Sequence, residues 1–179
     1  MTLPLIVELS ATRKAAVVDD EQSAFYSSAA WHTRSVTSQA SVGESYAVRA
    51  VVETFSFASG QTPRALLGGK FRPGPGGQLT AEVGSSRDPW SAPKNCASRL
   101  WLPFRAGLPE EYVGAVLDGP ADPALPPGTV SIDRAGHDEV NSSPQAFRTA
   151  ARLLAEVLLA MIAGRDVDAV VRTSVGGWA

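Results

Sequence analysis

The stretch TVSIDRAGHDEVNSSPQAFRTAARLLAEVLLAMIAG, residues 129–164, carries the strongest structural signals in this chain of 179 residues. Residues 130–133 are typical of a β-strand, and residues 134–141 of a polar loop. From Phe147 to Met161, apolar residues recur at spacings of three and four, which is the pattern of an amphipathic helix. Additional apolar residues widen that face, so we expect the helix to be covered by a sheet over most of its circumference.

The two ends of this helix are also marked. Ser142 followed by Gln145 has the spacing of a capping box, and Ser143 before a proline at the first helical position fits equally well. Gly164 is a natural stop, because glycine readily adopts the backbone conformation that ends helices. The sequence pattern therefore does not decide between Ser142 and Ser143 as the N-cap of this helix.

The rest of the chain is dominated by short strand signals. Alternating or β-branched runs predict strands at residues 3–9, 45–57, 65–71, 78–83, 98–104 and 168–175. Glycine and proline at residues 72–77 predict a hairpin between the third and fourth of these. Residues 109–117 predict a short helix, acidic residues 19–21 the start of another, and the Ser/Thr-rich residues 33–43 a loop.

Together these elements predict an α+β fold: a two-layer sandwich of a mostly antiparallel four- to six-stranded sheet with two helices on one face. The length fits a single domain. We expect residues 45–179 to form that domain, and residues 1–44 to form an N-terminal arm packed on it.

Composition argues against several classes of protein. Cys96 is the only cysteine and there are two histidines, so no disulfide or familiar metal motif is expected, and no cofactor. The first residues are too short an apolar run for a secretory signal, and no window is apolar enough to span a membrane, so we expect a cytoplasmic protein. A phosphate-binding loop is missing: the nearest match, Gly69-Lys70, has Arg64 and Phe71 at essential positions, so no GTP should bind here.

Charge is unevenly distributed along the chain. Residues 61–105 contain seven basic and two acidic residues, a net charge of +5, whereas the whole chain has −2 and the remainder therefore −7. A local basic face of this kind fits RNA or another anion, and a solvated loop surface is the plainer alternative.

Two segments resemble a known family. GLPEEYVGAVLDG, residues 107–119, and DEVNSSPQAFRTAA, residues 138–151, are similar to consecutive signatures of the fourth domain of elongation factor G. The same domain occurs in related ribosomal translocases and ribosomal-protection proteins. In that family a Pro-Lys/Glu-Glu-Tyr helix is followed by a strand, an acidic-Val-Asp-Ser-Ser loop and a helix with an early Ala-Phe.

The resemblance implies a left-handed βαβ crossover and a link to translation. The family's domain enters the ribosomal decoding site and contacts RNA through loops at its tip. One loop has a histidine immediately before its acidic-Val pair; that position is Asp138 here, with His137 one residue earlier. A second, glycine-rich tip loop should lie between residues 57 and 79, but SGQTPRALLGGKFRPGPGG, residues 59–77, does not match it.

The first hypothesis is therefore a non-catalytic, translation-related protein that binds RNA or the ribosome. The alternative is a structural or interaction protein that kept the fold but lost the RNA contacts, as a homodimer using its N-terminal arm; a small enzyme ranks third. The first hypothesis expects Arg64, Lys70 and Arg72 near the His137 loop, and a dispersed arrangement favours the second. The candidate residues for binding RNA or a partner are Arg64, Lys70, Arg72, Arg134, His137, Asp138, Glu139 and Asn141.

Overall fold

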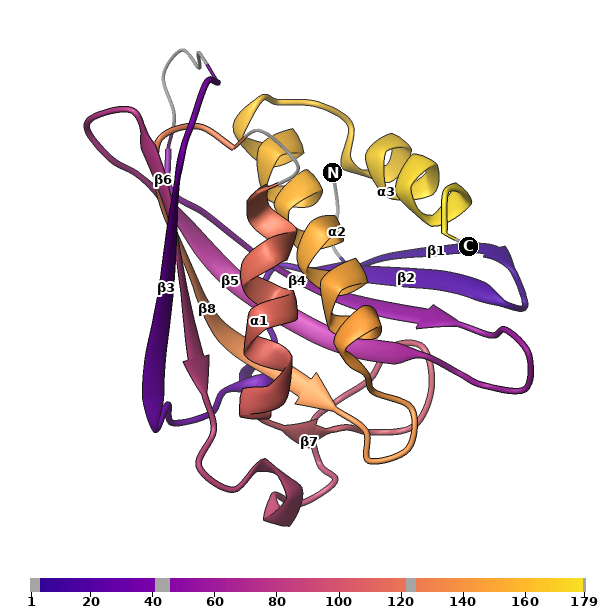
Figure 1. Cartoon of the computed structure of the whole chain (residues 1–179). Helices are drawn as coiled ribbons and strands as arrows, with labels where there is room; N and C mark the ends of the chain where they lie inside the picture. The colour runs from indigo at the N-terminus through magenta and orange to yellow at the C-terminus, as the bar shows by residue number, and fades with distance from the viewer. Residues whose placement is uncertain (1–3, 41–45, 122–124, 179) are drawn as a thin grey trace.

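The structure, a computed structural model, describes residues 4–40, 46–121 and 125–178 (Figure 1). It has an α+β architecture in which an open, mostly antiparallel sheet of eight strands carries three helices on one face. The strands are β1 (Leu5–Ser10), β2 (Arg13–Val18), β3 (Ala30–Thr37), β4 (Val48–Ser56), β5 (Arg64–Pro73), β6 (Gln78–Ser85), β7 (Arg105–Ala106) and β8 (Gly128–His137). The expected range of four to six strands is therefore too small.

The strand order is β1-β2-β4-β5-β8-β6-β3, and the two-residue β7 pairs with the end of β8. Among the described strands, β6 and β8 are the one parallel pair. The predicted hairpin between residues 65–71 and 78–83 is wrong, because β8 lies between β5 and β6. Nearly every residue of β8 is buried, so this strand requires a central position with neighbours on both sides.

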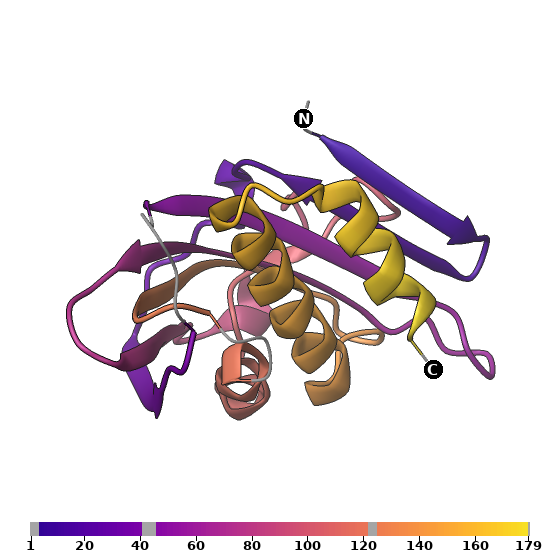
Figure 2. The same ribbon diagram turned by 90° about the horizontal axis from the view of Figure 1, so that it is seen from above.

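The three helices are α1 (Glu110–Asp118), α2 (Pro144–Ile162) and α3 (Val167–Gly176), and Figure 2 shows all three on the same side of the sheet. Helix α2 packs over β4 and β5, at the centre of the main hydrophobic core. Of the two helix starts that the sequence leaves open, the structure has Ser143 as the N-cap, with its hydroxyl accepting a hydrogen bond from the Ala146 N–H.

The third helix corrects the prediction of a strand at residues 168–175. Val167, Val171 and Val175 are buried at spacings of four, and this apolar stripe faces β1 and β2. The Asp166 carboxylate caps the helix by accepting the Asp168 N–H. The β-branched residues suggested a strand, but their spacing and the cap favour a helix.

The N-terminal arm contributes three strands to the sheet. β2 was not predicted, and β3 replaces much of the loop expected at residues 33–43, of which residues 41–43 lie outside the described residues. After the acidic residues 19–21 the chain forms only a 3₁₀ turn, η1 (Gln22–Ala24). Both outer strands of the sheet, β1 and β3, thus come from the arm.

The sheet face opposite the helices carries a smaller core. Residues 86–106 cross this face, and Cys96 and Phe104 pack there against Val51, Leu66 and Ala24. The strand predicted at residues 98–104 is wrong: the segment consists of bends, with one isolated bridge between Cys96 and Phe104. Within the described residues, no helix is both long and apolar enough to cross a membrane.

Candidate functional site

His137 is the last residue of β8 and is completely buried, so it is not an exposed loop residue as predicted. Its Nδ1 donates a hydrogen bond to the Gly107 carbonyl at 3.0 Å, and its ring meets Trp90 edge to face at 4.8 Å. Burial lowers the pKa of His137, which keeps the ring neutral at physiological pH. The imidazole therefore fixes the end of β8 and is not presented to solvent.

Asp138 organises the loop between β8 and α2. Its Oδ1 accepts the N–H groups of Val140 and Asn141 at 2.9 and 3.0 Å, and the Ser142 hydroxyl closes the loop by accepting the Asp138 N–H. Burial by itself raises the pKa of Asp138, but these hydrogen bonds and the charge of Arg64 lower the pKa overall. The position where the resemblance places a functional histidine thus holds a structural carboxylate.

Glu139 and Val140 form the exposed tip of this loop. Val140 is 85% exposed, and the Glu139 carboxylate binds Arg105 at 2.5 Å and Lys94 at 3.6 Å. Its hydrogen bond with Arg105 lowers the pKa of Glu139, so the carboxylate stays ionised and pairs with both cations. Asn141 is part of the loop's frame, since its side-chain oxygen accepts a hydrogen bond from Thr62.

Arg64 lies beside this loop but does not reach the surface. Its side chain is fully buried under Phe104, 3.9 Å from the Asp138 carboxylate, and it donates a hydrogen bond to the Leu102 carbonyl. Burial lowers the pKa of Arg64, and the nearby Glu53 and Asp138 oppose that shift. A guanidinium in this position stabilises the protein interior and has no access to RNA.

The other basic candidates are elsewhere. Lys70 pairs with Ser131 in the sheet register and Arg72 with Thr129. Ser131 precedes His137 by six residues, a separation of roughly 20 Å at the rise of an extended strand. Arg134 is nearly buried and binds Asp20 at 3.0 Å. The structure therefore brings Arg64, His137, Asp138, Glu139 and Asn141 together, but not Lys70 or Arg72.

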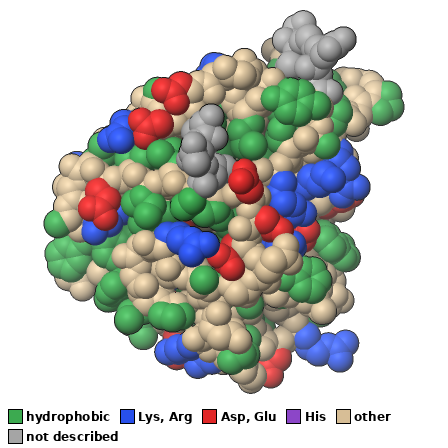
Figure 3. Space-filling view, turned by 180° about the vertical axis from the view of Figure 1, so that it is seen from behind, with side chains coloured by type: hydrophobic (Ala, Val, Ile, Leu, Met, Phe, Trp, Pro, Cys, Tyr) green, Lys and Arg blue, Asp and Glu red, His purple; other side chains and the backbone are tan. Residues whose placement is uncertain are grey.

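The face behind the sheet has interleaved charges. Figure 3 shows basic and acidic side chains interspersed among apolar ones, without a broad area of one sign among the residues it describes. Arg49 binds Asp133 at 2.8 Å, and Arg99 binds Glu21 at 3.2 Å. Of the positive charges that the sequence concentrates in residues 61–105, Arg99 is paired with Glu21, and Arg105 and Lys94 share the single negative charge of Glu139.

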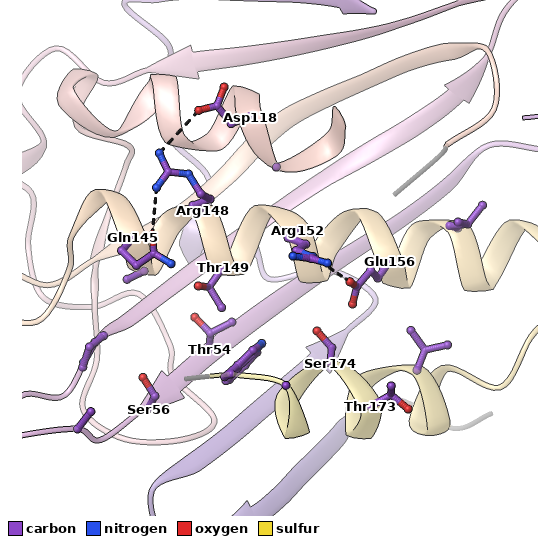
Figure 4. Close-up of a pocket in the computed structure, with 18 of the residues that line it drawn as sticks. Thr54, Ser56, Asp118, Gln145, Arg148, Thr149, Arg152, Glu156, Thr173 and Ser174 are labelled. Atoms are coloured by element: carbon purple, nitrogen blue, oxygen red, sulfur yellow. Dashed lines mark hydrogen bonds and ion pairs between the residues drawn. The ribbon is translucent and has the colours of Figure 1, made fainter. Parts of the chain in front are cut away.

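A broad hollow lies on the helical side of the sheet. It is a groove of about 1060 Å³ between α2 and α3, with Thr54 and Ser56 of β4 between the two helices (Figure 4). Hydroxyl groups from three elements line it, together with charged residues that are mostly paired: Thr54, Ser56, Thr149, Thr173, Ser174, Asp118, Arg148, Arg152, Glu156 and Arg165. None of the predicted site residues lines this groove.

The pairs in the groove are Arg148 with Asp118 at 3.7 Å and Arg152 with Glu156 at 3.3 Å. Such a lining can form hydrogen bonds with a polar ligand, but neither histidine of the chain lines the groove to activate a hydroxyl. The sequence marks Arg148, Arg152 and Glu156 only as the polar stripe of a helix; no signal indicates that α3 lies opposite them.

One Ser–His contact exists away from the groove. His32 Nε2 lies 3.2 Å from the Ser85 hydroxyl, on neighbouring strands at the sheet margin. Ser85 is only 1% exposed, so a substrate could not reach this hydroxyl. In the part of the chain that the structure describes, no cluster of three or more His, Cys, Asp or Glu residues is placed to bind a metal ion.

The chain matches no protein-family model and has no significant match among curated protein sequences.

Proposed function

We propose that this chain is a non-catalytic interaction protein whose fold resembles the fourth domain of elongation factor G, and that its partners are proteins, not RNA. In this proposal the chain has the architecture that the resemblance implies but does not make the family's contacts with RNA. Binding to RNA or the ribosome is the alternative function.

The path of the chain supports the relationship to that domain. From β4 onwards the elements follow the order strand, strand, strand, helix, strand, helix, apart from the short β7, and α1 connects the parallel strands β6 and β8. In Figure 1 both strands run downwards with α1 in front, and β8 lies to the right of β6, the sense of a left-handed crossover. Crossovers of this hand are rare, so sharing one is a specific similarity.

The observation that carries the proposed loss of RNA binding is the position of the basic residues. Arg64 is buried, Arg105 and Lys94 bind Glu139, and Lys70 and Arg72 lie far along the sheet from the loop that ends at Val140. RNA-binding surfaces need several cations free to contact phosphates on one face. Here the tip of the loop is instead an exposed valine beside a carboxylate that is paired with two cations.

Absence of catalysis is part of the same proposal. His137 is buried with its Nδ1 bonded to a carbonyl, and Ser85 beside His32 is inaccessible. A hydrolytic or transfer reaction needs an accessible nucleophile beside a base, and neither histidine provides that arrangement.

Co-sedimentation with ribosomes at low and high salt tests the proposal. We expect the chain to remain in the supernatant even at low salt, where phosphate-driven binding is strongest. Association that weakens as salt rises, and that is lost in a Lys70→Glu/Arg72→Glu variant, would contradict the proposal and support the RNA-binding alternative. The matched control is Arg172→Glu, which removes an exposed cation on α3, away from the strand that holds Lys70 and Arg72.

A further inference from the structure

We propose that β3 is a homodimerisation edge, along which a second copy of this chain pairs antiparallel to extend the sheet. The inference rests on the proposed function, because it names the partner of an interaction protein. The observations behind it come from β3 itself, and not from the β8–α2 loop or from the groove between α2 and α3.

The two outer strands of the sheet differ in how well they are protected. β1 has a register shift between Glu8 and Ser10, carries the Glu8–Lys14 ion pair at 3.1 Å, and is packed by α3. Irregularities and charges of this kind are the usual means by which proteins prevent pairing at a sheet edge. This outer strand is therefore a poor template for another chain.

β3 has fewer of these protections: its one charged side chain is Arg34, which is ion-paired with Asp118 of α1. All eight of its residues pair with β6 without a register shift, and it contains neither proline nor lysine. Six of the eight residues are exposed, including Trp31 at 55%. β3 is the last strand in the order of the sheet, and none of the described strands pairs with its other side. A long, regular, exposed edge strand is a template for strand addition.

The free backbone groups can be assigned from the ladder. The Ser38 N–H donates to the Gly77 carbonyl at 2.7 Å, which continues the register in which Thr37 lies opposite Gln78. Because hydrogen-bonded and non-bonded residues alternate in an antiparallel pair, the even-numbered residues of β3 bond to β6. The N–H and C=O groups of Trp31, Thr33 and Ser35 therefore point to the open edge.

The side chains of β3 favour a second copy as the partner. Antiparallel pairing about a two-fold axis at Thr33 places Thr33 opposite itself and Trp31 opposite Ser35 of the second copy. His32 then lies opposite Arg34, and no two residues with permanent like charges face each other. Moving the axis by one residue to Arg34 would place two guanidinium groups opposite each other, which disfavours that register. An isologous contact of this kind closes at two chains.

Sedimentation velocity over a range of concentrations tests the inference on the full chain. We expect a species of twice the 18.8 kDa chain mass. Thr33→Glu and Thr33→Lys each place two like charges across the axis, and each should weaken dimerisation at least about fivefold. An equal mixture of the two variants should restore the dimer, because glutamate then faces lysine. The same substitutions at Ser10, on the β1 edge, are the matched controls and should change nothing.

Thr33→Pro provides a second, independent variant. Proline removes an N–H that faces the open edge, so the bonds between β3 and β6 remain and the fold is retained. This variant should be monomeric and have the circular dichroism spectrum of the native chain. If Thr33→Pro does not fold, the mixing experiment alone decides.

Two results would overturn the inference: a monomer at every concentration, or a dimer whose affinity does not respond to the charge at position 33. Neither result changes the interpretation of the ribosome co-sedimentation experiment. Ribosome binding by a chain that still dimerises through β3 would contradict the proposed function and not this edge.

Discussion

The guanidinium carbon of Arg64 lies 3.6 Å from the centroid of the Phe104 ring, and neither side chain is exposed to solvent. The cation also lies near two carboxylates, Asp138 in the β8–α2 loop and Glu53 on β4. The contact joins the segment that crosses the back of the sheet to β5 and to the loop before α2. Arg64 is thus a structural residue at the junction of three parts of the chain.

Arg64→Ala should lower the free energy of unfolding by about 3 kcal/mol, because it opens a cavity under Phe104 and leaves buried Glu53 without its cation. Arg64→Met, which keeps most of the volume, should cost less than the alanine variant. Urea denaturation monitored by tryptophan fluorescence measures both.

The control for Arg64 is Arg99→Ala, which breaks an exposed ion pair with Glu21. Such pairs are worth at most about 1 kcal/mol. Equal losses at positions 64 and 99 would show that the burial of Arg64 has no energetic importance.

His137 should make stability depend on pH. Burial lowers its pKa below the ordinary value of 6.5, so the unfolded chain takes up a proton before the folded chain as pH falls. The stabilisation is present above pH 6.5 and is lost as pH falls towards the lowered pKa of the folded state. The urea midpoint should therefore be lower at pH ~5.5 than at pH ~7.5, two values that lie on either side of the ordinary histidine pKa.

His137→Gln should reduce that drop, because the titrating group is gone. An unchanged pH dependence in the His137 variant would refute the assignment.

Two glycines at the first helix provide a matched pair. A Cβ at Gly119 would lie 2.3 Å from the Ala151 Cβ and 2.8 Å from its backbone carbon, so α1 and α2 can approach only because this residue has no side chain. Gly119→Ala should lower the free energy of unfolding by about 2 kcal/mol through overpacking.

Gly114, five residues earlier and within α1, is exposed, and a Cβ added there would meet no other part of the described chain within 4 Å. Gly114→Ala should raise the free energy of unfolding by roughly 0.5–1 kcal/mol, because alanine restricts the unfolded chain and favours the helix. Thermal unfolding followed by circular dichroism compares the two; a shift in the same direction for both would contradict the packing at Gly119.

Cys96 should be inert to thiol reagents in the folded protein. Burial raises its pKa to about 12, so the reactive thiolate is scarce as well as inaccessible. Modification by an aromatic disulfide should proceed only as fast as the protein unfolds, and urea should accelerate it. An exposed thiol introduced by Ser27→Cys should react at once; comparable rates at positions 27 and 96 would contradict the burial.

The helices and central strands could be predicted where local signals and tertiary packing agree. Helix α2 has both an apolar period and a cap at Ser143, and α1 has acidic residues in its first turn. For α3, the prediction of a strand was wrong because it gave more weight to the β-branched residues than to their helical spacing. β3 was missed because an edge strand exposed on both faces shows no alternation of apolar and polar residues.

The binding site was harder to predict, because proximity depends on how the strands are ordered. Asp138 and Arg64 meet because β8 pairs with β5, whereas Lys70, six residues from Arg64, is carried away along the same strand. The groove brings together β4, α2 and α3, whose relative placement is set by burial over the whole sheet. The spacing of these residues along the sequence does not indicate how far apart they lie in the folded chain.

The insertion of β8 between β5 and β6 also sets the order in which the protein can assemble. β6 (Gln78–Ser85) is made well before β8 (Gly128–His137), and β5 and β6 are joined only when β8 arrives between them. The β4–β5 hairpin is local, but the β5–β8 and β6–β8 pairings join distant parts of the sequence, so we expect a folding barrier dominated by long-range contacts. Until β8 is made, the edges of β5 and β6 that it pairs with stay available to other chains, which favours aggregation.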